Sequence, residues 1–181
     1  MLRVRFSMGS AVDGLQIAGV SVRRDTGLHV ASLRYFDAAS DFAAAASSVL
    51  GGPLPAPLRA VQRQAGLALA WRSPTETLLL ADDVAAFADI RGMAAAHAEG
   101  CLVEQTGGIW GFTVVGARAS DLLLRLGSTE SIPAVGEART GRLAELSVMS
   151  LCLRPGEIML LVERLYAAHL QGWIRETLAD L

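Results

Sequence analysis

The densest group of side chains suited to chemistry lies between residues 136 and 146, in the run G-E-A-R-T-G-R-L-A-E-L. It holds Arg139, Thr140 and Arg142, and Arg164 follows a later apolar run. An arginine guanidinium presents its N–H donors in a planar fork that fits carboxylates and other oxyanions. We therefore interpret Arg139, Thr140, Arg142 and Arg164 as candidate contacts to a partner protein or a small anion. Ion pairs within the chain are the simpler alternative, and we expect a polar loop leading into an apolar strand.

Catalytic and metal-binding patterns are missing from the sequence. The three histidines lie far apart, and Cys101 and Cys152 each stand among apolar residues without a nearby second cysteine, so both are expected to be buried free thiols. The serines lack the G-x-S-x-G pattern of hydrolases, and the G-x-G-x-x-G pattern of dinucleotide-binding proteins is absent. We therefore expect no catalytic, cofactor-binding or metal-binding residues in this chain.

The basic residues of the chain exclude several enzyme classes. All 16 are arginine, and the 181-residue chain has neither lysine nor asparagine. Without lysine it cannot form a Schiff base through a lysine amine or complete a phosphate loop of the G-x-x-x-x-G-K type. The net charge of −2 and the scattered arginines give no electrostatic footprint for nucleic acid.

Composition also bears on surface and compartment. Counted with glycine, the apolar residues exceed the share typical of soluble domains, which predicts apolar surface that a monomer does not cover alone. The first residues lack a secretory signal, and the uncharged stretch 42–58 contains Gly51, Gly52 and three prolines, which prevent a membrane-spanning helix. We expect a cytoplasmic protein that does not contact a membrane.

Hydrophobic periodicity predicts the elements that position these residues. Strands are expected at residues 15–23, 28–36, 66–71, 76–81, 101–105, 109–115, 143–153 and 157–163. Helices are expected at residues 42–50, 82–99, 116–126 and 165–181, the last with an inner stripe of Leu165, His169, Leu170, Trp173, Ile174, Thr177 and Leu178. Prolines in 72–75 and 154–156 predict hairpin turns, and Asp82 and Asp83 favour a helix start.

The order of these elements is nearly repeated along the chain. Each half reads as a split β-α-β unit of ferredoxin-like type, so the expected fold is α+β, duplicated, with antiparallel sheets. We expect residues 1–181 to form a single compact domain built from two pseudo-repeats, about 15–106 and 107–181.

Four motifs in order resemble one known family. They are W-x-x-P-x-E-x-L-L-L at 71–80, G-x-x-A-x-D-L-L at 116–123, G-x-x-R-T-x-x-L-A at 136–144 and V-x-R-x-Y-A-x-x-L at 162–170, followed by Trp173. They are similar to the gamma subunit of heterotetrameric sarcosine oxidase, over roughly residues 60–181. The resemblance implies a fold related to the folate-binding domain of aminomethyltransferases.

The resemblance also implies a function in sarcosine catabolism and one-carbon metabolism. It implies a small, non-catalytic subunit that packs against larger flavin-containing subunits, which would carry FAD, FMN, NAD and tetrahydrofolate, oxidise sarcosine and pass its one-carbon unit to tetrahydrofolate. In the aminomethyltransferases a Thr-Gly-Glu carboxylate holds the pterin. Here Thr140 and Gly141 are followed by Arg142, whose side chain cannot accept hydrogen bonds.

Two alternatives remain open from the sequence. One is a stand-alone folate- or pterin-binding one-carbon protein, for which Glu104 and Asp121 are the candidate inward carboxylates. The other is a homodimer of the isolated chain that covers its own apolar face.

Overall fold

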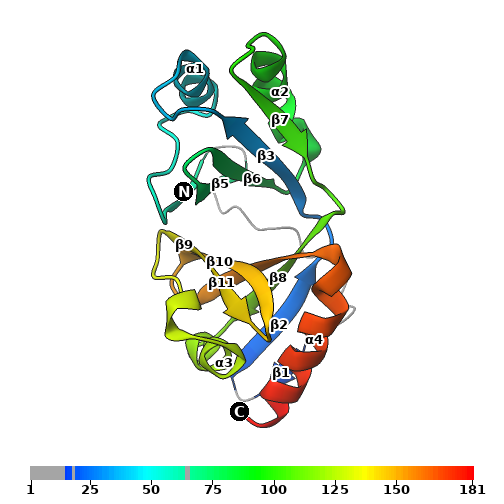
Figure 1. Cartoon of the computed structure of the whole chain (residues 1–181). Coiled ribbons are helices and arrows are strands. Elements are labelled where there is room, and N and C mark those ends of the chain that lie inside the picture. The colour runs from blue at the N-terminus through cyan, green and yellow to red at the C-terminus, as the bar shows by residue number, and fades with distance from the viewer. Residues whose placement is uncertain (1–14, 18, 64–65) are drawn as a thin grey trace. The chain divides into compact units, whose positions relative to one another are not determined.

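The computed structural model describes residues 15–17, 19–63 and 66–181 (Figure 1). Contacts between residues divide the chain into two compact units. The described part of the first unit lies within residues 27–107, and that of the second combines residues from 15–26 with 108–181. Each unit has its own hydrophobic core and its own antiparallel sheet.

The first unit is a five-stranded sheet with its helices on one face. Its elements in chain order are β3 (His29–Tyr35), α1 (Asp41–Val49), β4 (Ala60–Gln62), β5 (Leu67–Ser73), β6 (Glu76–Ala81), a 3-10 helix (Val84–Phe87), α2 (Ala88–Ala95) and β7 (Gly100–Glu104). The strand order is β4-β5-β6-β3-β7, and every pairing is antiparallel. Without β4, this is the order of a ferredoxin-like unit, as the sequence predicts.

Local chemistry explains the helix starts of this unit. The Ser40 side chain accepts a hydrogen bond from the Ala43 backbone N–H at the start of α1. The Asp83 carboxylate accepts one from the Ala85 backbone N–H at the 3-10 helix, so the predicted helix start is confirmed. Alternate residues of β3, namely Ala31, Leu33 and Tyr35, pack with the helices in the core.

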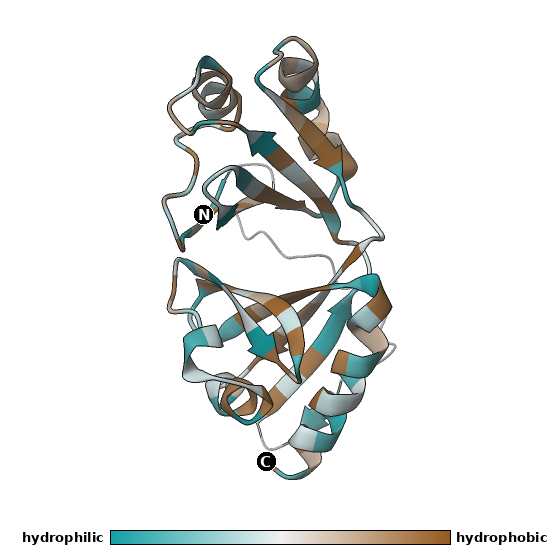
Figure 2. Cartoon of the chain, viewed as in Figure 1, coloured by the Kyte–Doolittle hydropathy of each residue, from teal (hydrophilic) through white to brown (hydrophobic). Residues whose placement is uncertain are grey.

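The second unit is a six-stranded sheet that repeats this arrangement. Its elements in chain order are β1 (Leu15–Ile17), β2 (Val20–Asp25), β8 (Ile109–Val115), α3 (Ala119–Leu126), a 3-10 helix (Thr129–Ser131), β9 (Glu137–Leu143), β10 (Leu146–Arg154), β11 (Glu157–Glu163) and α4 (Arg164–Ala179). The strand order is β1-β2-β8-β11-β10-β9. Figure 2 shows hydrophobic residues concentrated on the strands, whereas hydrophobic and hydrophilic residues alternate along α4.

The predicted boundary between the two repeats needs a correction at the N-terminal side. Residues of β1 and β2 were expected in the first repeat, but β2 pairs with β8 and completes the second sheet. In the first repeat β7 pairs with β3, and in the second β2 takes the equivalent place beside β8. The expected single strand 15–23 is a hairpin, because Gly19, with φ of +80°, turns the chain between Ile17 and Val20.

The loop expected over residues 136–142 is wrong. Residues 137–143 form β9, which pairs in register with β10 from Leu143 opposite Leu146 to Glu137 opposite Cys152. The turn between these strands consists of Ala144 and Glu145, with positive φ angles of 49° and 64°. Such a turn normally uses Asn and Gly, so the sequence carries no turn signal here.

Only three of the seven residues expected on the inner stripe of α4 are buried. The buried residues are Ala167, Leu170, Ile174 and Leu178, of which the last three were predicted. Leu165 is 86% exposed and Trp173 is 47% exposed. The buried residues of α4 pack in the core of the second unit, and Leu165 and Trp173 lie outside this buried stripe.

Candidate functional site

A pocket of about 600 Å³ lies in the first unit, where three segments of its sheet end. The segments are the end of β3, the β5–β6 hairpin and the start of β7. Its lining residues are Arg34, Tyr35, Phe36, Thr75, Glu76, Ala98, Glu99, Gly100 and Cys101. This volume falls within the range of small-molecule sites in proteins.

Strand register brings the polar residues of the pocket together. Glu76 is the cross-strand partner of Arg34, and Arg34 is the partner of Cys101 on the other side. Partners in adjacent strands project to the same face of a sheet. The row therefore lies on the face opposite the helices, because Tyr35, the next residue along β3, packs in the helix-covered core.

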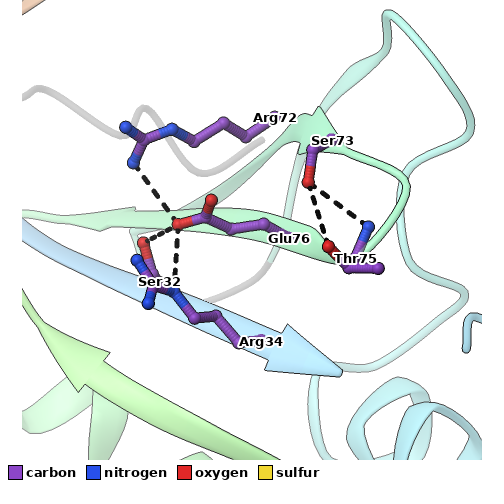
Figure 3. A network of polar contacts seen from close by, with 6 residues as sticks. All are labelled: Ser32, Arg34, Arg72, Ser73, Thr75 and Glu76. Atoms are coloured by element: carbon purple, nitrogen blue, oxygen red, sulfur yellow. Dashed lines mark hydrogen bonds and ion pairs between the residues drawn. The ribbon is translucent and has the colours of Figure 1, made fainter. Parts of the chain in front are cut away.

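Glu76 is the centre of a polar network (Figure 3). Its Oε1 accepts a hydrogen bond of 2.6 Å from the Ser32 hydroxyl and lies 3.5 Å from Arg34 Nε and 3.4 Å from Arg72 Nη1. Ser32 is fully buried, and the Glu76 side chain is only 15% exposed. A carboxylate held by two arginines and a hydroxyl has a fixed orientation, and it fixes the Arg34 guanidinium in turn.

The rim of the pocket carries an aromatic ring and a second carboxylate. Phe36 is 83% exposed, which is unusual for a large apolar side chain. Glu99 is exposed, and it has no hydrogen-bond or ion-pair partner among the residues that the structure describes. Together with Arg34, these groups provide one cationic, one anionic and one apolar contact.

The first two residues of β7, Gly100 and Cys101, both line this pocket. A Cβ atom at Gly100 would lie 2.5 Å from both the Arg34 carbonyl oxygen and the Phe42 ring, so only glycine fits between β3 and α1. The next residue, Cys101, is exposed, and the expectation of a buried thiol is wrong for it. β7 is the edge strand of the sheet, and its residues Cys101 and Val103 are both exposed. Cys152, on a strand inside the second sheet, is buried as expected.

The four candidate contact residues predicted from the sequence (Arg139, Thr140, Arg142 and Arg164) lie in the second unit, not at this pocket. Arg139 of β9 pairs with Glu137 through a hydrogen bond of 2.9 Å from Nε, and Thr140 of the same strand is exposed. Arg142 donates to the carbonyl and the carboxylate of Glu145. Arg139 and Arg142 thus have partners within the chain, which is the simpler alternative considered above.

Arg164 is separated from the other three in the sheet. It is exposed at the start of α4, after β11, and β10 lies between β11 and β9. Its backbone N–H donates to the Gly108 carbonyl. Contact of these four residues with a partner or an anion stays a prediction.

The two carboxylates considered for a pterin are used elsewhere. Glu104 of β7 receives hydrogen bonds from Arg91 of α2, and Asp121 of α3 receives one from Arg118. Neither lines the pocket, whereas Glu76, which the motif at 71–80 contains, does. Sequence reasoning missed Arg34, Phe36 and Glu99, because no pattern links three residues that only strand pairing brings together.

A buried carboxylate lies in the second unit as well. The Asp25 side chain is 5% exposed; its Oδ2 accepts a 2.6 Å hydrogen bond from the Thr113 hydroxyl, and Arg23 Nη1 lies 3.1 Å from Oδ1. Burial raises the pKa of Asp25 above its usual value, and the contacts with Thr113 and Arg23 oppose this shift in part. Asp25 lies in a polar cluster with one hydroxyl and one guanidinium, which suits a structural role.

Two features are absent from the described part of the chain. No group of three or more histidine, cysteine, aspartate or glutamate side chains is placed there to hold a metal ion. None of its helices has the length and hydropathy needed to cross a membrane.

Comparison by sequence gives no match, either to a protein-family model or to a curated protein. The structure, in contrast, is similar to a chain of the heterotetrameric sarcosine oxidase from Corynebacterium sp. U-96, solved in complex with pyrrole 2-carboxylate. The TM-score is 0.81 at 22% identity, and the alignment covers 91% of this chain and 87% of that chain. The two chains are therefore of similar length.

A second structure extends the likeness. The glycine cleavage system aminomethyltransferase T from Bartonella henselae gives a TM-score of 0.66 at 14% identity over 87% of this chain. Only 46% of that chain is covered, so this chain spans just under half its length. The resemblance predicted from the four motifs is confirmed at the level of the fold, and so is the predicted α+β fold with two antiparallel sheets.

Proposed function

We propose that this chain is the small, non-catalytic subunit of a heterooligomeric flavoenzyme of the sarcosine oxidase type. The observation that carries the proposal is the superposition, over nearly the full length of both chains, on a chain of a heterotetrameric sarcosine oxidase. In this proposal the larger subunits bind FAD, FMN, NAD and tetrahydrofolate and perform the oxidative demethylation of sarcosine. This chain supplies folded surface that covers part of them.

The outer face of α4 supports the proposal. Leu165, Tyr166 and Trp173 are 86%, 47% and 47% exposed on one helix, outside its buried stripe. Aromatic residues with large apolar area are enriched in protein interfaces, where they contribute much of the binding energy. We propose that this face, defined by Leu165, Tyr166 and Trp173, contacts a larger subunit.

Purification of the affinity-tagged chain from the organism that encodes it tests the subunit role. We expect larger subunits to co-purify in fixed stoichiometry, with the absorbance spectrum of bound flavin and with sarcosine-dependent consumption of oxygen. A colourless preparation that contains this chain alone, from cells that express it at its natural level, would contradict the proposal.

Substitutions on the surface test the role of α4. Trp173→Glu should reduce the amount of co-purified larger subunits at least about tenfold, since loss of a central interface aromatic costs 2 kcal/mol or more. Val135→Glu is the matched control, because Val135 is 53% exposed in the same unit but lies outside α4. Equal recovery with both variants would place the interface elsewhere on the chain.

The alternative of a folate- or pterin-binding protein has less support. The resemblance implies that Arg142 stands in place of the pterin-binding carboxylate; its side chain offers only hydrogen-bond donors and is paired with Glu145. We expect no saturable change in tryptophan fluorescence when tetrahydrofolate is added to the purified chain. A saturable change would favour this alternative.

A further inference from the structure

The geometry points to a small-molecule site in the pocket of the first unit. We propose that it binds a small zwitterion, a molecule with a protonated amine and a carboxylate on an apolar or aromatic body. The site lies within one unit of this chain, so the proposal does not depend on the subunit role.

The charges of the lining residues determine the class of ligand. Arg34, Glu76 and Glu99 are the charged residues that line the pocket. Arg34 and Glu76 neutralise each other in part, at 3.5 Å, while the Arg34 side chain remains 54% exposed. A lone cation can pair with Glu99 but not with Arg34, and a lone anion can pair with Arg34 but not with Glu99. A zwitterion satisfies both, with its carboxylate on Arg34 and its amine on Glu99.

The network around Glu76 prepares the anion contact. Ser32, Arg72 and Arg34 all reach Oε1 of Glu76, and Ser32 is fully buried. Glu76 therefore anchors the Arg34 side chain before a ligand binds. A side chain that is already oriented loses less conformational entropy on binding.

Phe36 provides the apolar contact. Its side chain is 83% exposed at the end of β3, and it lines the pocket next to Arg34 and Glu99. An exposed aromatic ring can stack on a flat ligand and can also attract a protonated amine through its face. A ligand that covers the Phe36 ring removes apolar area from water, which favours binding.

Three probes with the same phenyl body separate the contributions of the charges. They are L-phenylalanine, a zwitterion; 2-phenylethylamine, a cation; and 3-phenylpropionate, an anion. We expect calorimetric titration of the full chain to show L-phenylalanine bound about tenfold more tightly than either single-charge probe, a difference of about 1.4 kcal/mol.

Variants give a charge-specific pattern that general damage to the fold would not produce. Glu99→Gln should weaken L-phenylalanine and 2-phenylethylamine about fivefold and leave 3-phenylpropionate unchanged or tighter. Arg34→Gln should weaken L-phenylalanine and 3-phenylpropionate about fivefold and leave 2-phenylethylamine unchanged or tighter. Phe36→Ala should weaken all three probes. The matched control is Glu104→Gln, a change in a β7 carboxylate that pairs with Arg91 outside the pocket.

The titrations decide the proposal in either direction. The tenfold preference for the zwitterion together with the opposite effects of Glu99→Gln and Arg34→Gln would establish it. The proposal is overturned if none of the probes binds at about 10 mM, or if 2-phenylethylamine binds as well as L-phenylalanine. Binding that Phe36→Ala and Arg34→Gln leave unchanged would overturn it as well.

Discussion

Ser32 and Glu76 are joined across strands β3 and β6 by a hydrogen bond of 2.6 Å between the serine hydroxyl and Oε1 of the carboxylate. Ser32 is fully buried, so its hydroxyl needs a partner inside the protein. Glu76 supplies that partner and at the same time lies beside Arg34 and Arg72. One carboxylate therefore links the interior of the sheet to the polar lining of the pocket.

Replacement of Glu76 should destabilise the chain, and the loss should be smaller when the new side chain can still accept the hydrogen bond from Ser32. Glu76→Ala leaves the Ser32 hydroxyl and two arginines without their acceptor, so we expect a loss of about 2–4 kcal/mol in the free energy of unfolding. Glu76→Gln keeps an acceptor for Ser32 and should lose less than half as much. Urea denaturation measures both. If Glu76→Gln were as damaging as Glu76→Ala, the carboxylate charge rather than the hydrogen bond to Ser32 would dominate.

Asp25 should make stability depend on pH. Burial raises the pKa of Asp25 in the folded chain, so the folded state holds this proton more tightly than the unfolded state. Its contribution to stability is complete below the unfolded pKa and is lost as the pH rises through the folded pKa. We therefore expect Asp25→Asn to be at least as stable as the wild type at neutral pH and to lose that relative advantage as the pH falls to about 4 and below, where an aspartate of the unfolded chain is protonated as well.

Thermal denaturation between about pH 3 and pH 8 measures this effect, since one unit of pKa shift corresponds to about 1.4 kcal/mol. Thr113→Val provides the comparison. It removes the hydroxyl that donates a 2.6 Å hydrogen bond to Asp25, so it should raise the pKa of Asp25 further. A constant difference between Asp25→Asn and the wild type at every pH would mean that ionisation of Asp25 does not change on folding.

Glu145 holds a backbone conformation that favours glycine. Its φ is +64°, and its ion pair with Arg142 joins side chains that are 88% and 72% exposed, so the pair contributes little. We expect Glu145→Gly to raise the free energy of unfolding by about 0.5–1 kcal/mol, because the release of strain exceeds the added entropy of the unfolded chain. Glu145→Gln is the control: it removes the charge, keeps the strain and should change stability by less than about 0.5 kcal/mol.

Gly141 fits a place that has no room for a side chain. A Cβ atom there would lie 3.0 Å from Ser131 Cβ and still closer to Ser131 Oγ. Gly141→Ala should therefore cost about 1–3 kcal/mol, measured by urea denaturation. The double variant Gly141→Ala with Ser131→Gly should recover part of the loss, because it removes the obstructing side chain. No recovery would show that the backbone of β9, rather than Ser131, limits this position.

Local physical signals in the sequence were sufficient for much of the fold. Alternation over residues 28–36 predicted β3, prolines at 74 and 155 predicted the two hairpins, and Asp83 marked a helix start. The repeated order of elements indicated two ferredoxin-like units. Each of these signals acts within a few residues, through backbone dihedral preferences, capping hydrogen bonds or the period of one strand or helix.

Other features were decided only when distant segments packed. β9 forms because β10 lies beside it, although the turn at Ala144 and Glu145 has no favourable residue. β2 joins the second sheet by pairing with β8, and packing of α4 in the core of that unit decides which of its residues are buried.

The pocket depends on tertiary structure in the same way. Arg34, Glu76 and Glu99 come from three segments that strand pairing brings to one end of a sheet. Most strands and helices could be predicted from residue order alone, since those preferences are local. The tertiary structure decided which edges meet and which charges face one another, since cross-strand hydrogen bonds are nearly independent of side-chain identity and leave no pattern in the sequence.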